Sequence, residues 1–173
     1  STTCSRAVSR SFITRGHHVV TVMGQTGHIG RKIQPTLAST CAPSRFKHPE
    51  VAAHGDLGMV GPEDIILALS NSGETAELDA VLSHASRQKL FVIAMTAAPS
   101  SALAKAAEIV LALPSAKEAC PMGLAPTTST LLQLALGDAL ALALLERRNF
   151  TANDFSVFHP GGRLGARLRP VRD

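Results

Sequence analysis

The sequence contains no tryptophan, no tyrosine and few cysteines, and these shortages exclude several classes of protein. Without Trp or Tyr, the 173 residues cannot form the usual aromatic platform on which nucleic-acid bases stack. Cys4, Cys41 and Cys120 are widely spaced and form no CxxC pair, which excludes a disulfide framework and a thiolate zinc knuckle and indicates a reducing compartment. The longest apolar stretch, near residues 131–145, is interrupted by two polar residues, so it is predicted to be too short to span a bilayer.

Acidic residues are absent from the first part of the chain. None precedes Glu50, whereas seven Arg and Lys residues do, and four Arg residues lie among the last eleven positions. The formal charge of +4 gives a modest positive field that suits small anionic ligands. Solvated chain ends explain the same charges equally well. No motif supports nucleic acid as a partner, and none is expected.

The composition suits one globular domain. Apolar residues make up 45% and charged residues 17%, which is enough for a sizeable core. We expect residues 18–168 to form the domain and residues 169–173 to form a basic tail. Residues 1–17, rich in Ser, Thr and Arg, are expected to be a disordered or truncated lead-in, with a transit peptide as the alternative.

Apolar runs alternate with helical patterns along the chain. The runs predict five buried strands, at residues 19–23, 43–48, 64–70, 89–96 and 109–113. The segments between and after them predict helices, at residues 27–39, 74–87, 101–107 and 127–148. Continuous apolar strands separated by helices imply a parallel sheet covered on both faces. The predicted fold class is therefore α/β, a three-layer α-β-α sandwich with a five-stranded parallel sheet.

Two loops follow predicted strands and precede predicted helices, where open parallel sheets bind ligands. The first is Gly24-Gln25-Thr26-Gly27, whose small residues let backbone N–H groups approach an anion. Its spacing is neither a GxGxxG fingerprint nor a P-loop, and a plain tight turn is the alternative.

The second loop runs from Ser70 through Asn71 and Ser72 to Thr75. Its three hydroxyl groups and the start of the next helix form a suitable phosphate cradle. The alternative is an ordinary helix start with Ser72 as N-cap. Two such loops without a nucleotide motif favour a small phosphorylated ligand.

A carboxylate follows the last predicted strand. Glu118, beside a phosphate site, is a candidate general base, and a surface ion pair with Lys117 is the alternative. His54 and His159 lie in loops, where a single histidine is more often structural than catalytic. The spacing of the residues around His54 matches no standard zinc signature, and no metal is expected.

Six segments occur in an order that resembles a known family: GQTGHIGRK, AAHGDLGMV, SNSGET, AKEACPMGLAPTTST, LGDALA and HPGGRLG. Together they look like the sugar isomerase (SIS) domain of bacterial D-arabinose-5-phosphate isomerases, over about residues 19–168. The resemblance implies a cytoplasmic enzyme that interconverts D-ribulose 5-phosphate and D-arabinose 5-phosphate without a cofactor. This reaction supplies 3-deoxy-D-manno-octulosonate synthesis. It also implies a homodimer or homotetramer with sites at the subunit interfaces, and no membrane partner.

The resemblance also assigns roles. Glu118 is expected to be the proton-shuttling base, with Glu74 as its partner or substitute. His159 would act as acid or base on the sugar oxygens, and His54 matches another site position. The expected substrate-binding residues are Gly24, Gln25, Thr26, Gly27, Ser70, Asn71, Ser72 and Thr75.

Two departures from the family pattern bear on activity. Gln25 stands where the family usually has lysine, and Val51 stands where it has glutamate, with Glu50 one place off. The paired CBS modules that follow many of these domains are also absent from the sequence. The alternative function is therefore a weakened SIS module that senses a phosphosugar or a nucleotide-activated octulosonate. A purely structural subunit is a third reading, based on the long apolar helix.

Overall fold

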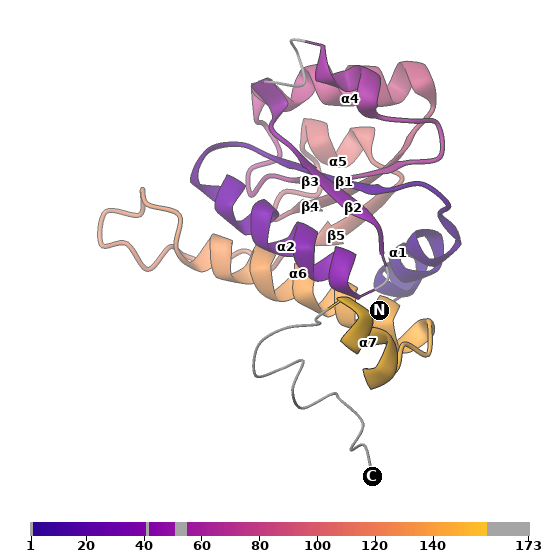
Figure 1. The fold of residues 1–173 in the computed structure, drawn as a ribbon. Helices are drawn as coiled ribbons and strands as arrows, with labels where there is room; N and C mark the ends of the chain where they lie inside the picture. Colours follow the sequence, from indigo (N-terminus) through magenta and orange to yellow (C-terminus); the bar gives the residue numbers. More distant parts are fainter. Residues whose placement is uncertain (1, 41, 51–54, 159–173) are drawn as a thin grey trace.

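The computed structural model describes residues 2–40, 42–50 and 55–158, and its core is one parallel sheet between two layers of helices (Figure 1). The strands are β1 (His18–Val22), β2 (Ser44–Lys47), β3 (Ile65–Leu69), β4 (Phe91–Thr96) and β5 (Ile109–Ala112). The helices are α1 (Thr2–Ile13), α2 (Gly27–Ser39), α4 (Asp79–Gln88), α5 (Ala102–Ala106), α6 (Thr128–Arg147) and α7 (Ala152–Phe158). Short 3₁₀ helices are η1 (Gly24–Thr26), η2 (Asp56–Met59) and η3 (Ala76–Leu78). The predicted five-stranded α/β architecture is confirmed.

The strand order places the candidate loops side by side. The order is β2-β1-β3-β4-β5, and every neighbouring pair is parallel. From β1 the chain crosses to β2 on one side, and it then returns to β3 on the other side of β1. The last residue of β1, Val22, pairs with the last residue of β3, Leu69. The loops after these two strands therefore flank the switch point of the sheet, where parallel sheets bind ligands.

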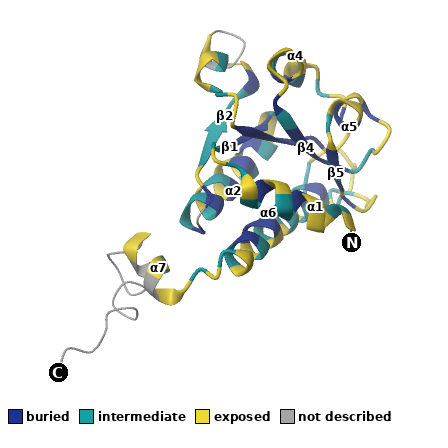
Figure 2. Ribbon diagram, turned by 90° about the vertical axis from the view of Figure 1, so that its right-hand side faces the viewer, coloured by how far each residue is buried: buried dark blue, intermediate teal, exposed yellow. Residues whose placement is uncertain are grey.

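Alternate side chains of each central strand enter two separate cores. In β3, Ile65, Leu67 and Leu69 face the core covered by α1, α2 and α6, while Ile66 and Ala68 face the core covered by α4 and α5. All five residues are buried, and the centre of the sheet is dark blue in Figure 2. This burial on both faces explains why the strands are continuous apolar runs in the sequence.

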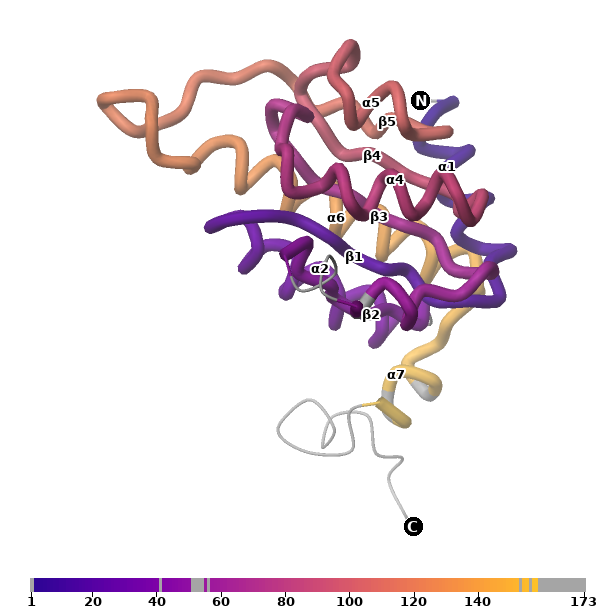
Figure 3. Tube along the Cα trace, turned by 90° about the horizontal axis from the view of Figure 1, so that it is seen from above, coloured from indigo at the N-terminus to yellow at the C-terminus, as the bar shows by residue number. Residues whose placement is uncertain are grey.

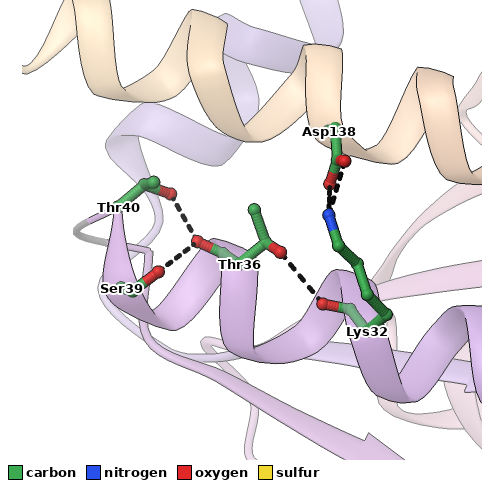
Figure 4. A network of polar contacts seen from close by, with 5 residues as sticks. All are labelled: Lys32, Thr36, Ser39, Thr40 and Asp138. Atoms are coloured by element: carbon green, nitrogen blue, oxygen red, sulfur yellow. Dashed lines mark hydrogen bonds and ion pairs between the residues drawn. The ribbon is translucent and has the colours of Figure 1, made fainter. Parts of the chain in front are cut away.

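Close contact between α2 and α6 fixes the layer below the sheet. Gly137 lies against Ile33, and a Cβ at Gly137 would stand 2.4 Å from the Ile33 Cδ1. At the neighbouring positions of the two helices, Lys32 Nζ contacts both carboxylate oxygens of Asp138 at 2.5 Å (Figure 4). The Thr36 hydroxyl donates to the Lys32 carbonyl at 3.0 Å, within α2. The contacts of Lys32 and Ile33 hold the middle of α2 against α6.

Two predictions about the helices are wrong. Residues 2–13 form the helix α1, with Ala7 and Ser11 buried, instead of the expected disordered lead-in. Its small and apolar side chains recur every three to four residues and cover the sheet edge beside β5.

The prediction that the long apolar stretch is too short to span a bilayer is also wrong. The stretch lies within the 20-residue helix α6, close to its predicted bounds of residues 127–148, and this helix is by length and composition long and apolar enough to cross a bilayer. About a third of its most apolar window, 33%, is buried within this chain. The buried positions include Gly137, Leu140, Ala141 and Leu144, so α6 serves as a core helix of the fold.

Candidate functional site

The loop after β3 is closed by hydrogen bonds between its own residues. The Ser70 and Thr75 hydroxyl oxygens are 2.7 Å apart, and the Gly73 N–H donates to Ser70 Oγ at 2.9 Å. The Glu74 N–H points to Ser72 Oγ at 3.3 Å. Ser70 is buried at the base of the loop, whereas Ser72 is exposed at its tip. The loop is therefore preorganised, with a hydroxyl group displayed toward solvent at the sheet edge.

The same loop is joined to the end of β4. The Asn71 carbonyl accepts the Ala97 N–H at 3.1 Å and the Thr96 hydroxyl at 3.2 Å. The Asn71 side chain is exposed. These bonds hold the loop after β3 against the neighbouring strand end, so its position depends on two strands of the sheet.

The helix after this loop begins later than predicted. Thr75 precedes the short helix η3, and α4 begins only at Asp79. The interpretation of Ser72 as an ordinary N-cap is therefore wrong, because residues 70–75 form an irregular loop. The bond between the Ser70 and Thr75 hydroxyls explains the delay, since it pulls the loop into a compact turn before the helix can start.

The loop after β1 contains the 3₁₀ helix η1, and α2 follows it at Gly27, as predicted. Gly24 has a φ of +64°, which turns the chain from the strand into η1. Gln25 is exposed and Thr26 is half-buried. Within the described part of the chain, the Thr26 side chain makes no cap hydrogen bond to α2. Both polar groups are thus available to a ligand at the switch point.

Glu74 is held by the helix layer that contains α4 and α5. Its Oε1 accepts the N–H of Ala102, the first residue of α5, at 3.0 Å. It lines a cavity of about 150 Å³ between the loop and the helices α4 and α5, together with Asp79. Two carboxylates without a lining cation do not suit a phosphate, so this cavity is not the phosphate cradle.

Glu118 is held by the helix layer that contains α1, α2 and α6. Its Oε2 accepts three hydrogen bonds from the start of α6: from the Thr127 N–H at 2.7 Å, the Thr127 hydroxyl at 3.0 Å and the Ser129 N–H at 3.3 Å. Hydrogen bonds, first from the Ser129 side chain and next from the Thr127 backbone, lower the pKa of Glu118 from 4.5 to about 2. The carboxylate therefore stays ionised and faces the positive end of the helix.

The two glutamates belong to different layers. Glu118 lies on the loop that leaves the end of β5 and projects from the body ahead of α6 (Figure 3). No hydrogen bond joins it to Glu74 among the residues that the structure describes, and its contacts to α6 replace the alternative ion pair with Lys117. His54 and His159 lie outside the described residues.

The site contains residues that the sequence analysis missed. Thr127 and Ser129 bind Glu118, although only Glu118 was singled out. The run of hydroxyl residues at the start of the long apolar helix, residues 127–130, was the available signal, since such residues are typical of helix starts.

A larger cavity lies elsewhere. Its volume is about 620 Å³, and it lies between the ends of α1 and α6 and the helix α7, lined by Phe12, Arg147, Arg148 and Phe158 among others. The carboxyl end of α6 is the opposite end from the one that binds Glu118. The candidate site is therefore the carboxyl edge of the sheet, not this cavity.

Comparison with known proteins gives consistent results. Residues 11–143 match the SIS domain. The chain is 52% identical over 162 residues to "Arabinose 5-phosphate isomerase KdsD" of Shigella flexneri, covering 94% of this chain and 49% of that protein. It is 56% identical over 154 residues to the protein of the same name from Pseudomonas aeruginosa, covering 89% of this chain and 47% of that protein. The chain thus spans about half the length of these relatives.

The match to one solved structure covers nearly the whole of both chains. The structure of an Escherichia coli CFT073 protein in complex with arabinose 5-phosphate superimposes with a TM-score of 0.82 and 37% identity. The alignment covers 92% of this chain and 93% of that one. Together with the match over residues 11–143, this likeness shows that the chain belongs to the SIS domain family.

Proposed function

We propose that this chain is the catalytic domain of an aldose–ketose isomerase that interconverts D-arabinose 5-phosphate and D-ribulose 5-phosphate, for 3-deoxy-D-manno-octulosonate synthesis in the cytoplasm. The observation that carries the proposal is the 37% identity, over nearly the whole of both chains, to a protein whose structure holds arabinose 5-phosphate. The names of the longer relatives support the same reaction.

The reaction moves one proton between two neighbouring carbons. A base removes the proton from C2 of the aldose while O1 gains a proton, which gives an enediol. Return of the proton to C1, with loss of the proton on O2, gives the ketose. Glu118 suits the base because three hydrogen bonds from the start of α6 give its carboxylate a fixed direction. A positioned base typically contributes about 10²–10⁴-fold to the rate. Glu74 is its partner or substitute from the opposite layer.

The phosphate is assigned to the loop after β3. The exposed Ser72 hydroxyl lies at the tip of a loop that Ser70 and Thr75 close from within. Gln25 and Thr26 line the sugar from the loop after β1. His159 and His54 complete the site by resemblance, as acid or base on the sugar oxygens and as a further site residue.

The proposal is tested by measuring ribulose 5-phosphate formed from arabinose 5-phosphate by the purified protein. Ser72→Ala is expected to raise KM with little change in kcat, because it removes a hydroxyl that holds the phosphate. Ser83→Ala, at an exposed serine of α4, is the matched control and should change neither constant. Binding of arabinose 5-phosphate without any conversion would contradict the proposal and would favour a sensing module.

The enzyme is proposed to be a homodimer or homotetramer. The helix α6 exposes a stripe of apolar residues at Leu131, Ala135, Ala139 and Leu142, spaced three to four residues apart. Leu131 is 67% exposed and Leu142 is 58% exposed. A stripe of this kind on a core helix fits the same stripe of a second copy about a two-fold axis.

The assembly is tested by sedimentation of the protein and of the variant Leu131→Glu. The charge is expected to lower the sedimentation coefficient to that of a single chain. Ser83→Glu adds the same charge on the exposed face of α4 and should leave the assembly intact. A wild-type protein that sediments as a single chain at working concentration would contradict the proposal.

A further inference from the structure

The hydrogen bonds from Thr127 and Ser129 to Glu118 form a clasp, which joins the candidate base to the rigid part of the fold. Glu118 lies on the segment of residues 113–127, which has no helix or strand and connects β5 to α6. A carboxylate on such a segment has no fixed direction of its own. Its direction is set instead by donors on α6, which is itself packed against α2 and the sheet.

Thr127 makes three contacts within the clasp. Its N–H and its hydroxyl both donate to Glu118 Oε2, at 2.7 and 3.0 Å. Its hydroxyl oxygen also accepts the N–H of Ala119, the residue after Glu118, at 2.9 Å. The same hydroxyl group therefore fixes both the side chain of Glu118 and the backbone beside it.

Ser129, two residues after Thr127, contributes a further hydrogen bond to Glu118. Its N–H donates to the same Oε2 at 3.3 Å, and its side chain is buried, with 6% of its surface exposed. The Thr127 and Ser129 N–H groups belong to the first turn of α6, whose N–H groups lack partners within the helix. Glu118 thus takes the place of an N-cap side chain.

We propose that Thr127 and Ser129 are positioning residues that hold the Glu118 carboxylate in a fixed direction for proton transfer in the isomerase reaction. This inference rests on the proposed function, because it gives Glu118 the role of base. The charged and titratable groups beside Glu118 are Lys117 and Cys120 on the same segment, and the first turn of α6 carries none. The hydroxyl groups of Thr127 and Ser129 are therefore the donors to Glu118 that substitution can remove, whereas the two N–H donors remain.

The direct test is a set of variants at Thr127. Thr127→Val keeps the shape of the side chain and removes its hydroxyl, whereas Thr127→Ser keeps the hydroxyl. Loss of a hydrogen bond to a charged group is expected to lower kcat about tenfold in the valine variant, with KM for arabinose 5-phosphate nearly unchanged. The serine variant should restore kcat. Thr128→Val, at the neighbouring hydroxyl, is the matched control and should behave as wild type.

A second readout does not depend on turnover. Titration of the Glu118 carboxyl carbon by NMR should show its pKa higher in Thr127→Val and higher again when Ser129→Ala is added. The acid limb of the pH–rate profile should move in the same direction. If Thr127→Val does not fold, Ser129→Ala alone takes its place in both measurements.

The outcomes separate the two proposals. An unchanged Glu118 pKa and an unchanged kcat per folded molecule in Thr127→Val would overturn the positioning role, even if the melting temperature falls. Absence of isomerase activity in the wild type would overturn the proposed function instead. The NMR titration would still decide whether Thr127 and Ser129 control the ionisation of Glu118.

Discussion

Gly73 lies against Ser101 so closely that no larger residue fits. A Cβ at Gly73 would stand 2.0 Å from Ser101 Oγ and 3.1 Å from Thr96 Oγ1. The backbone of Gly73 also has a φ of +68°, in the left-handed region. The Ser101 side chain cannot move away freely, because it caps α5 by accepting the Ala104 N–H. The glycine therefore allows the loop after β3 to lie against the start of α5.

Gly73→Ala is expected to damage both stability and substrate binding. The left-handed backbone and the overlap with Ser101 together predict a loss of roughly 1–3 kcal/mol in the free energy of unfolding. The displaced loop should also raise KM for arabinose 5-phosphate. Urea denaturation and steady-state kinetics check the two effects. Gly58→Ala, where an added Cβ meets nothing within 4 Å, is the control, and equal losses in both variants would contradict the explanation.

Gln25→Lys is expected to raise activity. Gln25 is exposed on the loop after β1, where a lysine would offer a charge-assisted bond to the phosphate or to the enediolate oxygen. Such bonds are about twice as strong as neutral ones, which predicts a gain of roughly tenfold in kcat/KM. Gln25→Met, of similar length without charge, should show no gain. If both variants lose activity equally, glutamine itself is required at this position.

Adjacent residues of α6 should differ sharply in their effect on stability. Gly137→Ala would push a Cβ into Ile33, and we expect it to cost about 1–3 kcal/mol because the α2–α6 contact is overpacked. Asp138→Asn removes the ion pair with Lys32, whose side chain is 48% exposed. Surface pairs of this kind contribute about 0–1 kcal/mol. Urea denaturation should therefore give a clearly lower free energy of unfolding for Gly137→Ala than for Asp138→Asn. The reverse order would contradict the packing argument.

The buried His18 should make the fold sensitive to mild acid. Burial lowers the pKa of His18 from 6.5 to about 4 and outweighs the nearby Pro43 backbone, which acts in the opposite direction. Below pH 6.5 the unfolded chain binds a proton that the folded chain does not, so the stabilisation present above pH 6.5 is lost as the pH falls toward 4. The slope of this contribution approaches about 1.4 kcal/mol per pH unit.

The comparison of wild type with His18→Leu isolates this contribution. Urea denaturation at pH 7.5, 6 and 5 should show a steeper loss of stability in the wild type than in the variant. His28→Asn, at an exposed histidine of α2, should keep the wild-type slope. Parallel slopes for wild type and His18→Leu would show that another group controls the acid response.

The sequence predicts the sheet well and the site contacts only in part. The helix at residues 27–39 and the strand at residues 64–70 correspond to α2 and β3 because their apolar patterns are long and unbroken. The helix α1 was missed because its composition, rich in Ser and Arg, outweighed a weak apolar stripe. Local pattern thus predicts buried elements better than helices at the edge of the fold.

The contacts of Glu118 illustrate what sequence alone does not predict. Its place after the last strand follows from the order of the elements. Its partners depend on how residues 113–127 return to the start of α6, which no local pattern specifies. The delayed start of α4 has a similar cause, since it depends on a hydrogen bond between two side chains, Ser70 and Thr75.

The central claim, that Glu118 moves a proton through an enediol, is tested most directly by ¹H NMR in D₂O. The protein is incubated with arabinose 5-phosphate and compared with Glu118→Gln. We predict conversion to ribulose 5-phosphate with deuterium uptake at the exchanging carbon, both lost in the variant while its fold and its binding of the sugar phosphate remain. Conversion and deuterium uptake at the wild-type rate in Glu118→Gln would contradict the claim.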